Sequence, residues 1–186
     1  HLAGGRRWWH SRRRARYPAR LGAFIVWLVT RRPALNIRVL IWNFGAFKFL
    51  LRGSMIGDLL RWRFHRGIAA LLDGAHPVGC SHHQKILVID DTLAACGGID
   101  MTSERWDTSE HREHDRRRRL PGGKPYGPWH DVTILMEGEV AGALADFGRE
   151  RWKIACGREL PRCEPPARSL WPAWIDADFD DVEVGL

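Results

Sequence analysis

The stretch that decides the fold of this chain is residues 83–98, which reads HQKILVIDDTLAACGG. It contains His-x-Lys, four residues, Asp, six residues and Gly-Gly. The Ile- and Val-rich run before a polar Asp-Asp-Thr turn predicts a strand over residues 81–89, and residues 93–96 predict a second short strand. Because side chains alternate between the two faces of a strand, we expect His83 and Lys85 to lie on the same face.

An imidazole and an ammonium group side by side suit a phosphodiester. Neutral imidazole is a usable nucleophile near pH 7, and the Lys85 ammonium can stabilise the charge that develops on phosphorus. Gly97 and Gly98 lack a Cβ, so they allow close approach to a ligand or a tight turn. A His-x-Lys alone is common by chance, but this pattern fixes five positions over sixteen residues. It therefore predicts attack on a phosphodiester by a histidine, with His83 as a catalytic residue.

The motif and its flanks resemble the phospholipase D/transphosphatidylase (HKD) superfamily. The similar flanks are GGIDMTSERWDT at 97–108 and PYGPWHDVTILMEGEVAGALADFGRERW at 125–152. Upstream, RRPALNIRVLIWNF at 31–44 is similar to the end of a helix and a buried strand of that superfamily. The resemblance covers about residues 21–186. It corresponds to the N-terminal half of a two-motif enzyme.

The resemblance implies roles for particular residues. His83 would be the nucleophile or its general-acid counterpart, Lys85 would bind phosphate, and Asp90 would give structural and polar support to the motif. Asp131 falls where the family places a carboxylate behind the catalytic imidazole, although the cap of a strand start is the alternative. Such a carboxylate fixes the imidazole tautomer and stabilises its cationic form.

The resemblance also implies substrate-binding positions at Gly97, Gly98 and Asp100. Many superfamily members carry Asn or Ser at the last of these positions and donate a hydrogen bond to phosphate from it. An ionised Asp100 cannot donate such a bond. The Gly-Gly-Ile-Asp form is similar to the eukaryotic-type phospholipase D branch.

The composition favours a folded chain with anionic partners. At 186 residues the chain is long enough for one core, and it is 45% hydrophobic with ten Trp. The net charge of +7 favours phospholipid headgroups or an anionic membrane surface, with nucleic acid less favoured. Seven Arg lie within residues 1–20, and residues 116–119 form a second basic block. Each basic block is either a solvated segment or a segment that is attracted to lipid.

The remaining features of the sequence concern the location of the protein and its need for a cofactor. The apolar run at residues 21–29 is too short to span a bilayer, so we expect a helix packed on a sheet and a cytoplasmic or membrane-peripheral protein. The four Cys include no C-x-x-C pair, so free thiols are expected. We expect neither a metal nor another cofactor, because this chemistry needs none.

Alternating strands and helices predict an α/β fold with a mixed β-sheet flanked by helices. We expect a basic arm at 1–20, an HKD lobe at 21–155, and a Pro-rich linker with an acidic tail at 156–186 that leads to a second lobe. The expected helices are 21–29, 45–51, 55–63 and 139–153. The expected strands are 36–42, 81–89, 93–96 and 132–136, with 67–73 either strand or helix, 103–128 a long polar loop and 182–184 the start of another strand.

These observations favour phosphatidyl transfer from a phospholipid to water or an alcohol. That chemistry normally uses two HKD motifs, whereas this sequence contains one. We therefore expect the second half-site to come from the same parent chain or from a homodimer. The alternatives are an HKD nuclease that acts as a homodimer and a catalytically incomplete fragment that binds phosphate or membrane.

Overall fold

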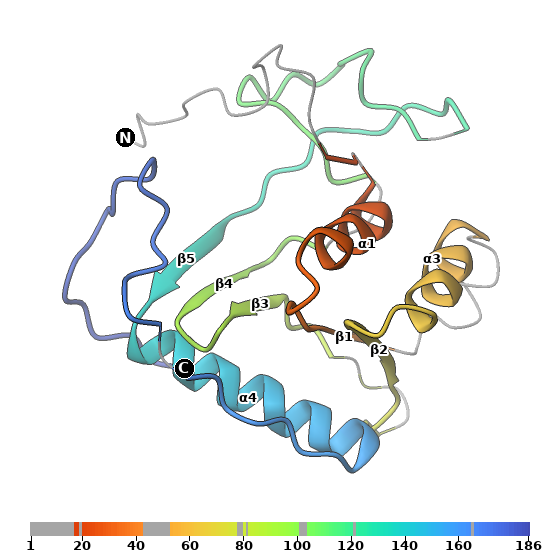
Figure 1. Ribbon diagram of the computed structural model, residues 1–186. Coiled ribbons are helices and arrows are strands. Elements are labelled where there is room, and N and C mark those ends of the chain that lie inside the picture. Colours follow the sequence, from red (N-terminus) through yellow and green to blue (C-terminus); the bar gives the residue numbers. More distant parts are fainter. Residues whose placement is uncertain are drawn as a thin grey trace. The chain divides into compact units, whose positions relative to one another are not determined.

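The computed structural model describes residues 17–18, 20–42, 53–77, 80, 82–100, 104–120, 122–164 and 166–186. Their elements, in chain order, are α1 (Leu21–Arg31), β1 (Ile37–Trp42), α3 (Gly53–Arg63), β2 (Ile68–Asp73), β3 (Ile86–Ile89), β4 (Leu93–Gly97), β5 (Thr133–Glu137) and α4 (Glu139–Cys156) (Figure 1). They divide into two compact units. One comprises the described residues of His1–His82 with Ile154–Arg158, and the other comprises His83–Lys153 with Glu159–Leu186.

The first unit contains a two-stranded parallel sheet with helices α1 and α3. β1 and β2 pair in register from Ile37↔Ile68 to Trp42↔Asp73, and parallel strands need a crossover connection, which includes α3. The apolar run of α1 presents Ile25 and Val29, four residues apart, to a core that also contains Trp62 and Ile68. The expected helix at 21–29 is thus confirmed, and residues 67–73 form a strand rather than a helix.

The second unit contains a three-stranded antiparallel sheet in the order β3-β4-β5. A tight turn joins β3 to β4, and its Asp90 and Asp91 have positive φ values of 48° and 54°. Aspartate tolerates this conformation better than most residues, and two consecutive positive φ values match the hairpin turn of type I′. The Thr92 amide donates to the Ile89 carbonyl at 3.1 Å and closes the turn.

Helix α4 covers one face of this sheet. Buried Ala94 of β4 packs against Ala141 and Leu144 of the helix, and the inward side chains of all three strands complete the cluster: Ile86, Val88, Cys96 and Met136. Alternation along β3 accounts for this, since Ile86 and Val88 point inward whereas Leu87 and Ile89 are 48% and 44% exposed. The helix ends at Cys156, and Gly157 follows with φ 71°, as is common after a helix C-terminus.

The predicted α/β class is confirmed, with parallel and antiparallel pairing in two separate sheets. The prediction of a strand over 81–89 is wrong in its first half, because β3 begins at Ile86 and residues 82–85 are not in a strand. The expected strand start at 182–184 is also wrong, because residues 166–186 contain no helix or strand. The helix expected at 45–51 and most of the 1–20 arm lie outside the described residues. The three-part division of the chain stays a prediction.

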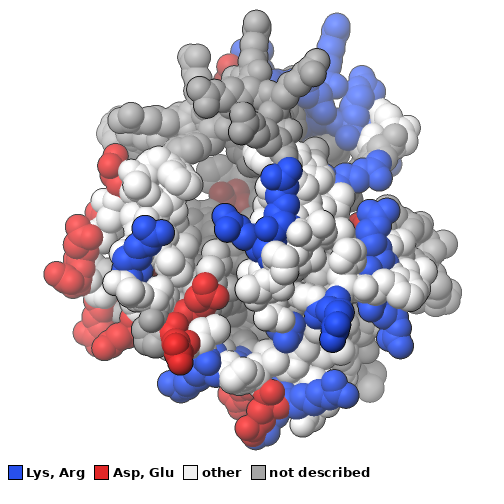
Figure 2. All heavy atoms as spheres, in the orientation of Figure 1, with Lys and Arg blue, Asp and Glu red and all other residues white. Residues whose placement is uncertain are grey.

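Acidic and basic side chains are unevenly distributed over the face drawn in Figure 2. Asp and Glu lie mainly at its left, where the C-terminal segment of Figure 1 runs. Lys and Arg are spread more widely, from the upper right down the right side and along the bottom. Within the described part of the chain, no helix combines the length and the apolar character needed to cross a membrane.

Candidate functional site

Lys85 lies at the open end of the β3–β4 hairpin. Its carbonyl accepts the Gly97 amide at 3.3 Å, so it extends the hairpin by one pair beyond β3. Its ammonium donates to the His83 carbonyl at 3.3 Å and lies 3.2 Å from the Asp100 carboxylate. Only 12% of the Lys85 side chain is exposed. The cation is thus fixed beside the backbone of His83, whose own side chain is exposed.

The two glycines of the motif make room for the segment that enters β5. A Cβ on Gly97 would lie 2.4 Å from the Val132 carbonyl oxygen, and one on Gly98 would lie 2.4 Å from Asp131 Oδ1. The Gly98 amide donates to the Val132 carbonyl at 3.2 Å, and the Gly97 amide is bonded to Lys85. Both amides are therefore engaged within the protein, and the close approach that the glycines allow is to residues 131–133.

Asp131 lies at the entrance to β5. It directly precedes residue 132, where the sequence predicts this strand to begin. Its Oδ1 accepts the Val132 amide at 2.8 Å and its Oδ2 accepts Trp129 Nε1 at 3.4 Å. β4 lies between β5 and β3 in the sheet, so the Asp131 strand is not adjacent to the His83 segment. Among the described residues, the His83 ring and the Asp131 carboxylate share no hydrogen bond or ion pair. The observed contacts are those of a strand-start cap, and a role behind the imidazole stays a prediction.

Asp90 lies at the other end of β3, in the hairpin turn. From Lys85 to Asp90 the chain advances five residues, or about 16 Å at the ~3.3 Å rise of a strand. Its backbone carbonyl accepts the Thr92 hydroxyl at 2.9 Å, whereas its carboxylate has no polar partner among the described residues. The structure thus gives Asp90 a turn position, remote from Lys85.

Asp100 and Arg105 connect Lys85 to Trp129. Asp100 lies between two cations, with Lys85 Nζ at 3.2 Å and an Arg105 guanidinium nitrogen at 3.8 Å. The guanidinium carbon of Arg105 lies 3.8 Å from the centre of the Trp129 ring, a cation–π geometry that fixes its plane. Because Trp129 Nε1 also donates to Asp131, Lys85 and Asp131 belong to one connected set of contacts.

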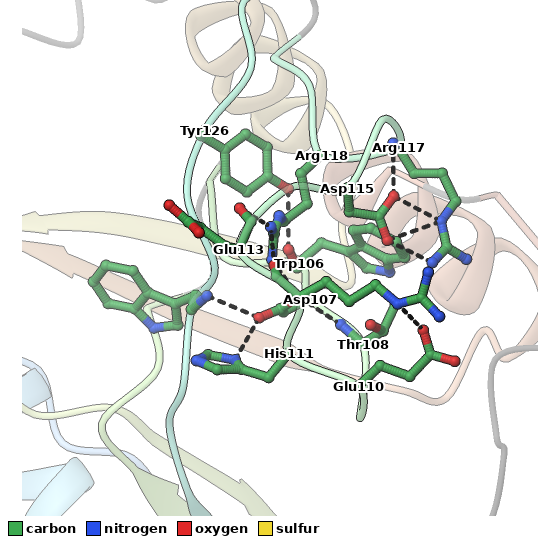
Figure 3. Close-up of polar contacts among 12 residues, drawn as sticks. Trp106, Asp107, Thr108, Glu110, His111, Glu113, Asp115, Arg117, Arg118 and Tyr126 are labelled. Atoms are coloured by element: carbon green, nitrogen blue, oxygen red, sulfur yellow. Dashed lines mark hydrogen bonds and ion pairs between the residues drawn. The ribbon is translucent and has the colours of Figure 1, made fainter.

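Asp107 organises the long loop before β5 (Figure 3). Its Oδ1 accepts the Thr108 amide at 2.8 Å and an Arg118 guanidinium nitrogen at 2.7 Å. Its Oδ2 accepts the Trp129 amide at 3.0 Å and lies 2.7 Å from His111 Nδ1. Asp107 therefore connects the start of the loop to Arg118, farther along the loop, and to Trp129 at the entrance of β5.

Arg118 is the buried cation opposite Asp107. None of its side chain is exposed, and only 7% of the Asp107 side chain is. Besides Asp107, its guanidinium donates to the Glu113 carbonyl at 2.7 Å and to the Arg112 carbonyl. Burial alone would raise the pKa of Asp107, but hydrogen bonds from the Thr108 and Trp129 amides and from Arg118 outweigh it and lower that pKa.

A surface hollow of about 330 Å³ lies beside this loop. Its lining includes Arg105, His111, Trp129, His130 and Asp131. The His111 and His130 rings meet edge to face with their centres 5.7 Å apart. No group of three or more side chains of the metal-ligating types gathers among the described residues. The hollow therefore presents cationic, aromatic and carboxylate groups to the same space.

Sequence reasoning missed the roles of Arg105 and Arg118. Residues 116–119 look like a uniform basic block, yet Arg118 is fully buried while its neighbours in the block are exposed. The signal that could have found Arg118 is the need of a buried Asp107 for a cation, but nothing in the spacing shows that Asp107 is buried. Arg105 lies five residues after Asp100, and no residue of the Gly-Gly-Ile-Asp sequence indicates that an arginine approaches this carboxylate.

Comparison with known proteins finds similarity to phospholipases D over part of the chain. No family model matches the chain. Phospholipase D B from Dictyostelium discoideum is 32% identical over 106 residues, covering 43% of this chain and 9% of the relative. Phospholipase D1 from Saccharomyces cerevisiae is 32% identical over 118 residues, with coverages of 47% and 7%. Phospholipase D alpha 1 from Vigna unguiculata is 29% identical over 107 residues, with coverages of 43% and 13%.

These relatives confirm the predicted resemblance to the phospholipase D superfamily over part of the chain. The chain spans about a tenth of the length of the curated relatives that it matches, between 7% and 13% for those named above. The chain is thus similar to one part of these phospholipases D, and the similarity does not extend over their whole length.

Proposed function

We propose that this chain supplies one HKD half-site of a phospholipase D-type phosphodiesterase that acts on phospholipids. The observation that supports this most is the position of Lys85, whose ammonium is held beside the His83 backbone by the His83 carbonyl and Asp100. The complete spacing of the motif and the similarity to phospholipases D support the same reading. An imidazole and a fixed cation that can reach the same phosphate suit attack on a phosphate diester.

The proposed reaction has two displacements. A ring nitrogen of His83 attacks phosphorus, the bond from phosphorus to the leaving alcohol breaks, and a second imidazole protonates that alcohol. That imidazole then removes a proton from water or an acceptor alcohol, whose oxygen attacks phosphorus and breaks the phosphorus–nitrogen bond. Lys85 stabilises the charge on the non-bridging oxygens in both steps. Gly97 and Gly98 serve by letting the Asp131 segment approach the hairpin.

The second imidazole lies outside the HKD motif of this chain, because the sequence holds the pattern once. We propose that a second HKD lobe supplies it, either from the same parent chain or from a second copy. The two sources differ in their dependence on concentration. A dimer gives a specific activity that rises with protein concentration, whereas a lobe in the same parent chain gives activity only to a longer protein that contains both motifs.

The test measures phosphatidyl transfer by mass spectrometry. The chain, over a range of concentrations, and any longer parent protein are incubated with phosphatidylcholine vesicles and a primary alcohol. We expect a phosphatidyl-alcohol product that disappears in His83→Ala and persists in His114→Ala, a control at a side chain that is 92% exposed. Nicking of plasmid DNA without lipid product would assign the nuclease alternative. Absence of both activities would reject catalysis and leave a phosphate- or membrane-binding fragment.

A further inference from the structure

The pair of cations around Asp100 has the form of an anion-binding site. Lys85 and Arg105 come from different segments, one before β3 and the other after the Gly-Gly-Ile-Asp sequence, yet both approach the same carboxylate, at 3.2 and 3.8 Å. The side chains of the two cations are only 12% and 22% exposed, whereas that of Asp100 is 47% exposed. The carboxylate therefore lies on the solvent side of the cations.

Arg105 is held in place with donors to spare. Its guanidinium stacks on the Trp129 ring at 3.8 Å, and one terminal nitrogen donates to the Glu104 carbonyl at a long 3.4 Å. Its Nε is buried and has no hydrogen-bond partner among the described residues. A guanidinium carries five N–H donors in a planar fork that matches the oxygens of a phosphate. Arg105 is thus oriented by the Trp129 ring, and one of its N–H donors has no partner among the described residues.

We infer that Arg105 is a second phosphate-binding cation beside Lys85, and that Asp100 is an internal anion that a substrate phosphate displaces from between them. Asp100 carries one negative charge against two positive charges, so an incoming phosphate competes with a carboxylate whose side chain is 47% exposed. This inference deepens the function proposed above, since it assumes that the phosphate of the diester reaches Lys85. It gives Asp100 a role that needs no donated hydrogen bond.

The probe is inorganic phosphate, titrated into the purified chain at constant ionic strength with chloride as the balancing anion. The Nε–H signal of Arg105 in a ¹H–¹⁵N NMR spectrum reports binding, and calorimetry gives the affinity. Loss of a charge-assisted hydrogen bond changes an affinity by about tenfold, so we expect Arg105→Gln to weaken phosphate binding by about that factor. Asp100→Asn, which removes the competing charge, should tighten it.

Arg105→Lys and Arg112→Gln complete the series. Arg105→Lys keeps the charge without the fork and should fall between wild type and Arg105→Gln. Arg112, in the same loop, is 67% exposed and pairs with Glu110, so Arg112→Gln should bind phosphate as wild type does. If Arg105→Gln is unfolded by its melting curve, Arg105→Lys and Asp100→Asn carry the test.

Two results would overturn the inference. Phosphate affinity unchanged in Arg105→Lys and Arg105→Gln would remove Arg105 from the site, and weaker binding in Asp100→Asn would show that Asp100 supports the anion instead of competing with it. Turnover measured in wild type and His83→Ala tests the proposed function, whereas phosphate affinity in the Arg105 and Asp100 variants tests this inference. Phosphate binding that depends on Arg105, without turnover in any protein that contains both half-sites, rejects the enzyme alone, whereas turnover with insensitive Arg105 and Asp100 variants rejects this inference alone.

Discussion

Arg118→Ala is the substitution that should most disturb the loop before β5. It removes a guanidinium with no exposed side-chain surface and leaves Asp107, 7% exposed, without its cation. It also leaves the Glu113 carbonyl without the 2.7 Å hydrogen bond that it accepts from Arg118. The Trp129 amide, which donates to Asp107 at 3.0 Å, then depends on a carboxylate that has lost its contact with Arg118.

The expected loss follows from the burial of the pair. Removing one partner of a buried ion pair destabilises a protein by about 3–5 kcal/mol. We expect the lower end, about 3 kcal/mol, because Asp107 keeps hydrogen bonds from Thr108 and Trp129 and its contact with His111. For a chain of this size each kcal/mol lowers the melting temperature by about 2–4 °C. The melting temperature should therefore fall by roughly 6–12 °C.

Arg116→Ala is the matched control for this prediction. Arg116 belongs to the same basic block, but its side chain is exposed and has no polar partner among the described residues. Its replacement should change the free energy of unfolding by less than about 0.5 kcal/mol. Urea titration followed by tryptophan fluorescence measures both variants, and hydrogen exchange at the Trp129 amide reports the loop directly. Equal unfolding midpoints and equal Trp129 exchange in the two variants would refute the argument that the buried pair holds the loop.

Three further predictions concern the hairpin, acid and the motif lysine. Gly97→Ala should destabilise the protein more than Gly98→Ala in urea titrations, because the new Cβ meets the Val132 backbone in the first and the movable Asp131 carboxylate in the second; the reverse order would contradict this. The pKa of Asp107 is lowered below its ordinary 3.8, so its stabilising contribution is complete above about pH 4 and is lost as the pH falls through the folded-state pKa. Unfolding free energies measured from pH 6 to pH 2 should therefore fall less steeply in Asp107→Asn, and parallel curves would show that Asp107 is not a source of the acid sensitivity. Lys85→Ala should weaken phosphate binding in calorimetry while changing the melting temperature little, and a large drop in melting temperature would instead make Lys85 a structural residue.

The regular elements could be predicted because their signals are local. The apolar run that forms α1 and the amphipathic run that forms α4 have helical periodicity, and β1 and β4 are short apolar runs bounded by turn residues. The beginning of β3 could not be predicted in this way. A strand also needs a hydrogen-bonded partner, and β4 ends at Gly97, opposite Lys85, so β4 offers no further strand residue to pair with residues 83 and 84.

The polar contacts of the site were less predictable than its location. The sequence points to Lys85 and Asp100, and the structure adds Arg105 and the contacts that join the three side chains. Composition cannot distinguish Arg118 from its exposed neighbours, because burial of one arginine depends on a carboxylate eleven residues earlier and on carbonyls of the loop itself. Long-range polar contacts of this kind carry no periodic signal in the sequence.

The hairpin explains the spacing of the HKD motif in physical terms. Four residues of β3 separate Lys85 from the turn, and four residues of β4 lead from Leu93 to Cys96, so that Gly97 returns to a position opposite Lys85. Asp90 supplies the positive φ of the turn, and the glycines admit the Asp131 segment beside the returning strand. The Asp and Gly positions of the motif therefore set the length and closure of the hairpin, whereas the proposed contacts with phosphate fall to His83 and Lys85. A substitution at Asp90 should accordingly act through the turn, and one at Lys85 through the charge.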